Sequence, residues 1–183
     1  SAGRDAALAR GQLLHRLMQS LPDIPAERRA EAAHGYLARA IKNLSEETRE
    51  SFVKGDELEI LQKNALTVLE NSQFRALFSP GSRAEVPIVG NLPQGRVSGQ
   101  IDRLAVTPEA VWIGDFKTNR PAPRRIEDVP PGYIVQLALY RAVLAKLYPD
   151  RPIRAALVWT EVPDLMELSA KVLDVALAQV TTL

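Results

Sequence analysis

Apolar residues recur at helical spacing through the first part of the chain, to about Phe78. The clearest stripe is Leu13, Leu14, Leu17, Met18 and Leu21. Residues three and four apart share one helix face, so this stripe predicts an amphipathic helix that ends before Pro22 to Pro25. Two more helical stretches follow, one from about Ala26 to Leu44 and one that begins at Ser45, where Thr48 and two glutamates form a capping pattern.

The hydrophobic period changes from helical to two at Arg83, after a turn at Ser79 to Gly81. Alternation of apolar and polar residues predicts three strands, and these are Arg83 to Val89, Val97 to Val106, and Val111 to Thr118. Only short connections separate them. We therefore expect an antiparallel meander.

The last third of the chain combines a loop, two helices and a strand. A proline-rich stretch from Asn119 to Pro131 precedes a helix from about Gly132 to Leu147. A strand from Ile153 to Thr160 and a terminal helix from about Ser169 complete the pattern. The sum predicts an α+β fold.

Length and composition favour one folded unit. The 183 residues, 46% of them hydrophobic and 25% charged, can bury one sizeable core. We expect one domain over residues 1–183, with a helical part at 1–78 and a sheet-containing part at 83–183. No apolar run reaches transmembrane length and no signal-peptide pattern is visible, so we expect a soluble, cytoplasmic protein without membrane partners. The chain starts at Ser1, which suggests a fragment of a longer protein.

The charged and sulfur-containing residues restrict the chemistry. The absence of cysteine excludes disulfides, zinc-thiolate sites and cysteine-ligated iron-sulfur clusters, so a metal would need oxygen or imidazole ligands. The net charge of +1 is far from that of a protein that grips nucleic acid by bulk electrostatics. Arg120, Arg124 and Arg125 form a local basic cluster in the proline-rich loop, either a contact for a DNA backbone or part of a solvated connector.

The hairpin formed by the second and third strands places two carboxylates opposite each other. If Val106 pairs with Val111, Asp102 faces Asp115 on the same side of the sheet, roughly 5 Å apart between Cβ atoms. Two like charges in that position destabilise the sheet unless a partner compensates for them. A divalent cation such as Mg²⁺, which prefers oxygen ligands, is the simplest candidate.

Two further residues extend this predicted site. Lys117 lies two residues beyond Asp115 and projects to the same side, where an ammonium group could hold a water nucleophile or stabilise negative charge. Glu85 in the first strand could supply a third carboxylate, or it could be an exposed strand residue. By itself an Asp-X-Lys triplet is often only a surface ion pair.

Four motifs in order give these residues a family context. They are Gly11 to His15, Gly99 to Leu104, Gly114 to Asn119, and Gln136 to Tyr140. Together they resemble the RecB-like branch of the PD-(D/E)XK nucleases, and within it the C-terminal nuclease domain of the AddA subunits of bacterial AddAB helicase-nucleases. The resemblance covers nearly the whole chain.

The resemblance implies a restriction-endonuclease-like core, with a central mixed sheet flanked by helices, and a role for each motif residue. His15, Asp102, Asp115 and the carbonyl of Phe116 would bind Mg²⁺, or Mn²⁺ as a substitute. Lys117 would be catalytic. Two residues of one helix face, Gln136 and Tyr140, would complete the site.

The resemblance also implies a biological setting. The chain would be the exonuclease domain of a helicase-nuclease in double-strand break repair and recombination, receiving single-stranded DNA from the motor beside an AddB-like partner subunit. Two alternatives stay open: a catalytically decayed DNA-binding or subunit-assembly module, and an RNA or repair nuclease of the same superfamily that works alone.

Overall fold

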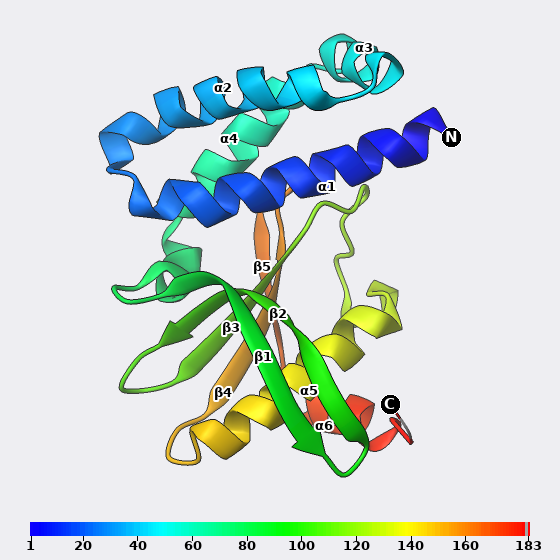
Figure 1. The fold of residues 1–183 in the computed structure, drawn as a ribbon. Helices are drawn as coiled ribbons and strands as arrows, with labels where there is room; N and C mark the ends of the chain where they lie inside the picture. Colours follow the sequence, from blue (N-terminus) through cyan, green and yellow to red (C-terminus); the bar gives the residue numbers. More distant parts are fainter. Residues whose placement is uncertain (182) are drawn as a thin grey trace.

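A five-stranded mixed sheet lies between two groups of helices (Figure 1). The computed structural model describes residues 1–181 and 183. The strands follow one another across the sheet in the order β1-β2-β3-β4-β5. They span Arg83–Leu92, Gly95–Val106, Val111–Lys117, Ile153–Trp159 and Asp164–Leu168.

The pairing of the strands confirms the expected meander and makes the sheet mixed. β1, β2 and β3 pair antiparallel, whereas β3 and β4 pair parallel. A parallel pair needs a long crossover, and α5 provides it. β5, antiparallel to β4, was not anticipated, because its five residues are mostly half-buried and lack a strong alternating pattern.

The helical elements follow the sequence-based expectations closely. The α-helices are α1 Ala2–Ser20, α2 Arg29–Ala40, α3 Glu46–Lys54, α4 Glu57–Glu70, α5 Pro131–Leu147 and α6 Ala170–Ala178. Short 3-10 segments lie at Leu21–Asp23, Ala26–Arg28, Ile41–Asn43, Ser72–Phe78 and Ile126–Asp128.

The third expected helical stretch is two helices rather than one. Ser45 caps α3 as predicted, since its side chain accepts a hydrogen bond from the backbone N–H of Thr48. The chain then breaks at Gly55 and Asp56, where Asp56 adopts a left-handed conformation with φ of 51°. Aspartate tolerates this conformation better than most residues, so the pair separates α3 from α4.

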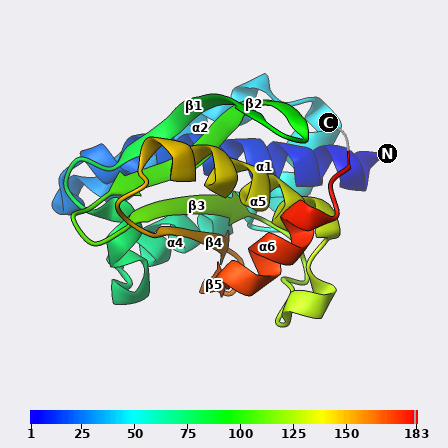
Figure 2. The same cartoon turned by 90° about the horizontal axis from the view of Figure 1, so that it is seen from below.

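Neighbouring residues of the central strands belong to two hydrophobic cores. Phe116 of β3 and Val158 of β4 pack with the N-terminal helices. Ile113 and Leu157 belong to the second core, with α5 and α6. Figure 2 shows α5 and α6 side by side. Because side chains alternate along a strand, both faces of the sheet are covered.

Helix α1 runs across the sheet and lies above it in the view of Figure 1. Its apolar stripe is buried against the other N-terminal helices and the sheet, with Leu14, Leu17 and Met18 at most 1% exposed. This packing fixes the rotation of α1 about its axis and directs His15 toward the sheet. Among the described helices, none combines the length and apolar character needed to cross a membrane.

Candidate active site

The register of the β2–β3 hairpin is the one expected from the sequence. Val106 pairs with Val111, and Leu104 pairs with Ile113. The assigned pairing ends one residue further, at Arg103 and Gly114. Beyond this point the Asp102 side chain takes the place of a backbone acceptor on β2. Its Oδ2 accepts a hydrogen bond of 2.9 Å from the backbone N–H of Phe116.

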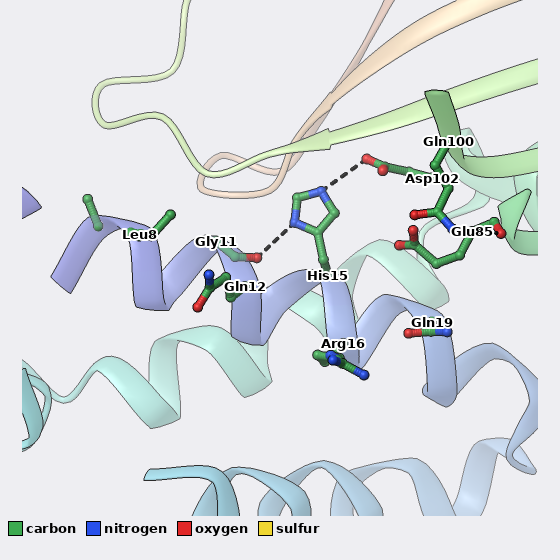
Figure 3. A pocket seen from close by; sticks show the side chains of 10 residues that line it. Leu8, Gly11, Gln12, His15, Arg16, Gln19, Glu85, Gln100 and Asp102 are labelled. Atoms are coloured by element: carbon green, nitrogen blue, oxygen red, sulfur yellow. Dashed lines mark hydrogen bonds and ion pairs between the residues drawn. The ribbon is translucent and has the colours of Figure 1, made fainter. Parts of the chain in front are cut away.

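Helix α1 brings His15 to the same carboxylate. Its Nε2 lies 3.0 Å from Oδ2 of Asp102, and its Nδ1 lies 2.8 Å from the carbonyl oxygen of Gly11 (Figure 3). The hydrogen bond with Asp102 raises the pKa of His15 to about 9, although burial acts in the opposite direction. Both ring nitrogens therefore have fixed partners, which orients the imidazole at the site.

The two aspartates respond to this environment in opposite ways. Burial raises the pKa of Asp102, but hydrogen bonds with His15, Asp115 and the Phe116 amide outweigh it, and the net shift is downward. Burial, followed by the proximity of Asp102, raises the pKa of Asp115 to about 7. Two carboxyl groups this close favour one charged and one protonated form.

The three side chains fit a divalent cation. Ligand atoms of His15, Asp102 and Asp115 all lie within 4.8 Å of one another. Oδ2 of Asp115 is buried and has no hydrogen-bond partner, which is an unfavourable state that a cation would relieve. Carboxylate oxygens are suitable ligands for Mg²⁺ or Mn²⁺, and Nε2 of His15 could join them once its proton is released.

Lys117 reaches the site from the end of β3. Its Nζ lies 3.2 Å from Oδ2 of Asp115, and this ion pair acts to lower the pKa of the carboxyl group. The same Nζ lies 4.1 Å from the centroid of the Tyr133 ring, which attracts the ammonium group electrostatically. Asp115 and Tyr133 thus hold the ammonium group beside the carboxylates.

Helix α5 covers the site on the face of the sheet opposite to helix α1. A cavity of about 140 Å³ is lined by His15, Gln100, Ile101, Asp102, Ile113, Gly114, Asp115, Lys117, Gln136, Leu137 and Tyr140. Nε2 of Gln136 donates a hydrogen bond of 3.3 Å to the hydroxyl of Tyr140. All six side chains expected to form the site therefore meet at one cavity.

Gly99 explains how Tyr140 comes so close to the sheet. A Cβ atom at this position would lie 2.1 Å from the Tyr140 hydroxyl oxygen, far inside van der Waals contact. Only glycine lets the helix and the strand approach in this way. The first residue of the Gly99 to Leu104 motif is therefore explained by packing.

The structure adds two residues that sequence reasoning did not assign to the site, and it leaves one assignment open. Gln100 lines the cavity, and Tyr133 contacts the lysine. The sequence held a signal for both, because Gln100 faces Lys117 in the expected register and Tyr133 lies three residues before Gln136 on α5. The Phe116 side chain packs in the N-terminal core, and metal binding by its carbonyl stays a prediction.

Glu85 lies at the edge of the site, beside Asp102 and Gln100 (Figure 3). Its φ of 53° is unusual for a glutamate within a strand. Burial and the nearby charge of Asp102 raise its pKa. A role in metal binding stays a prediction.

The three arginines of the proline-rich loop differ from one another. Arg120 makes ion pairs with Glu57 at 2.8 Å and with Glu161 at 3.0 Å. Arg124 is exposed, and Arg125 pairs loosely with Asp128 at 3.3 Å. Arg120 is therefore the least available for DNA, and contact with DNA stays a prediction for all three.

Two carboxylates, a lysine and a histidine converge where a strand pair opens in a mixed sheet with helices on both faces. This arrangement could hold a divalent cation beside a lysine. The model of the PD-(D/E)XK nuclease superfamily matches residues 2–179, so the chain belongs to that superfamily. The mixed sheet and its flanking helices are its restriction-endonuclease-like fold. No curated protein matches this chain.

Proposed function

We propose that this chain hydrolyses phosphodiester bonds in DNA with the help of Mg²⁺, for which Mn²⁺ can substitute. The observation that carries the proposal is the convergence of His15, Asp102 and Asp115 within 4.8 Å, with the unsatisfied oxygen of Asp115 among them. A bound divalent cation would lower the pKa of a water molecule and neutralise negative charge on the reacting phosphate.

The residues of the chain then have separate tasks. His15, Asp102 and Asp115 hold the cation, and the carbonyl of Phe116 is proposed as a further ligand. The Lys117 ammonium group, held by Asp115 and Tyr133, positions the attacking water by hydrogen bonding and stabilises charge on the phosphate oxygens. Gln136 and Tyr140 orient the lysine or the strand that is cut.

At a finer level, we propose an exonuclease domain of an AddA-type helicase-nuclease in double-strand break repair and recombination. The order and content of the four motifs support this assignment, and so does the net charge of +1. A motor that feeds single-stranded DNA and an AddB-like partner subunit would supply much of the grip on DNA. The nuclease chain itself would then need few basic contacts.

Two alternatives predict different behaviour. A decayed module would bind DNA or a partner subunit without cutting, and the complete set of site residues disfavours it. A nuclease of the same superfamily that works alone on RNA or in repair would cut without any motor. Cleavage assays on labelled DNA and RNA separate these possibilities.

The decisive experiment is cleavage of labelled single-stranded DNA by the wild type and by Asp115→Ala, with Mg²⁺ and with EDTA. We expect cleavage only by the wild type with Mg²⁺, with a loss of at least about a hundredfold in the variant. Asp150→Ala is the matched control, because Asp150 is exposed and pairs with Arg151 away from the site.

Circular dichroism of Asp115→Ala tests whether the fold survives the substitution. Persistent cleavage by a folded Asp115→Ala variant would refute the assignment of this site. If the wild type is inactive alone and also inactive within a longer protein that carries the motor, the decayed module is the correct description.

A further inference from the structure

A groove of about 630 Å³ runs along α1 and opens beside the catalytic cavity (Figure 3). The two spaces share His15, Gln100 and Asp102. Glu85 lines the groove on the sheet side. Leu8 lines it on α1, toward the beginning of that helix. Any ligand in this groove therefore touches the residues proposed to hold the cation.

The α1 side of the groove is polar at regular intervals. Gln12, Arg16 and Gln19 are exposed and line it, and Figure 3 shows them in succession along the helix. Positions i, i+4 and i+7 share one helix face, and the seven residues from Gln12 to Gln19 span about 10 Å. This row of donors is long enough to meet consecutive phosphates of an extended strand.

Arg16 is the cation of this row. The ion pairs of the described residues do not include it, whereas Arg10 and Arg120 both pair with Glu161. Arg16 lines the groove together with His15 and Asp102, so a phosphate next to the cleaved bond would be within its reach. An unpaired guanidinium group beside a catalytic site is well suited to bind a phosphate.

We propose, on the basis of the nuclease function above, that this groove holds the DNA strand that is cut, through hydrogen bonds from Gln12, Arg16 and Gln19 to its phosphates. The contacts carry no sequence information, because they reach only the backbone. The groove offers the strand one cation and two neutral amides from α1, and Glu85 and Asp102 place carboxyl groups on its sheet side. Its affinity for DNA therefore depends only weakly on salt.

The recessed position of the carboxylates favours a single strand. Asp115 is 8% exposed, and the side chains of Asp102 and Lys117 are 16% and 19% exposed. A lone strand can bend its phosphate down to them.

The test measures binding of fluorescein-labelled oligodeoxythymidylate by fluorescence anisotropy, in an Asp115→Ala background that prevents cleavage. We expect Arg16→Ala to weaken binding roughly tenfold and to reduce the slope of log affinity against log salt by about 0.7. The double variant Gln12→Ala/Gln19→Ala should weaken binding without changing that slope. Arg39→Ala, an exposed arginine on α2, is the matched control and should bind like its parent.

A cross-linking experiment maps the strand directly. The chain has no cysteine, so Gln19→Cys or Arg39→Cys creates a unique attachment point for a photo-crosslinker. We expect cross-links to oligodeoxythymidylate from position 19 and not from position 39. Equal cross-linking at both positions would overturn the proposed groove.

The results separate this proposal from the nuclease assignment. If the wild type cleaves DNA but Arg16→Ala binds like its parent with an unchanged salt slope, the groove does not bind the strand as proposed. The nuclease function would be unaffected by that result. If the groove variants weaken binding but the wild type never cleaves, the groove stands on its own. Stronger competition by a blunt duplex than by the single strand would contradict the single-stranded ligand.

Discussion

The Asp115 carboxylate combines burial with an unsatisfied oxygen. It is 8% exposed, its Oδ2 has no hydrogen-bond partner, and its pKa is raised to about 7 by burial and by Asp102. The Lys117 ammonium group 3.2 Å from this oxygen compensates the buried charge only in part, because the pKa of Asp115 stays raised, so the group weakens the metal-free protein. The cation proposed for this site would compensate the buried charge.

This conflict predicts that Asp115→Asn stabilises the metal-free protein at pH 8. The folded-state pKa of Asp115 lies above the unfolded value, so the native state loses stability as the pH rises toward 7 and stays weakened above it. Asparagine has no such charge, and we expect a gain on the order of 1–2 kcal/mol at pH 8 that disappears near pH 4. Urea unfolding in EDTA at both pH values measures it. A destabilised variant at pH 8 would contradict this account.

At the scale of elements, ion pairs hold the chain segment that follows the site. Arg120 lies three residues after Lys117 and binds Glu57 at the start of α4 and Glu161 between β4 and β5. The side chains of both glutamates are 14% exposed. Partly buried pairs of this kind contribute more to orientation than exposed pairs do. We infer that they fix the end of β3 against the helices.

Arg120→Gln should therefore impair catalysis more than folding. A small displacement of Lys117 and Asp115 reduces the cleavage rate at saturating DNA, by roughly tenfold, while Tm falls by only a few degrees. Arg120→Lys should recover part of the rate. Cleavage rates and thermal unfolding curves are the measurements.

Arg154→Gln provides the matched control for Arg120. Arg154 also forms a bidentate pair, with Glu167 on the neighbouring strand, but it lies near the start of β4, away from the site. We expect an unchanged cleavage rate in this variant. Equal losses of rate in the two variants would show that Arg120 has no special positioning role.

At the scale of the whole molecule, the site lies where the two halves of the fold meet. His15 comes from the N-terminal helical part, whereas Asp102 and Asp115 come from the sheet, and Gln136 and Tyr140 come from α5 on its other face. A cation bound by the first three would connect α1 to β2 and β3. Ligand binding to the native state alone stabilises the elements that it connects.

We expect Mn²⁺ to slow amide hydrogen exchange in α1 and in β2 and β3 together. In His15→Ala the protection of α1 should disappear, and weaker protection of the two strands should remain, because the carboxylates still bind the ion. Hydrogen exchange followed by mass spectrometry, with EDTA as the reference, measures both regions. Protection confined to the strands in the wild type would exclude His15 as a ligand.

The sequence by itself determined the local elements, the hairpin register and most of the residues that line the cavity. Helical and two-residue periodicities set α1 and β1 to β4, because they reflect which face of each element is buried. The turn between β2 and β3 fixed the pairing of Val106 with Val111. The four motifs led to the residues that line the cavity. Short β5 was missed because its residues, Asp164–Leu168, do not alternate between apolar and polar.

Only the tertiary structure decided which of these residues meet. The contact between His15 and Asp102 joins positions 87 residues apart, and it depends on how α1 packs across the sheet. The ion pairs of Arg120 and the free guanidinium group of Arg16 have no local signature either. Periodicity reflects how deeply each side chain is buried. Contacts between residues far apart in the sequence depend instead on how whole elements pack against one another.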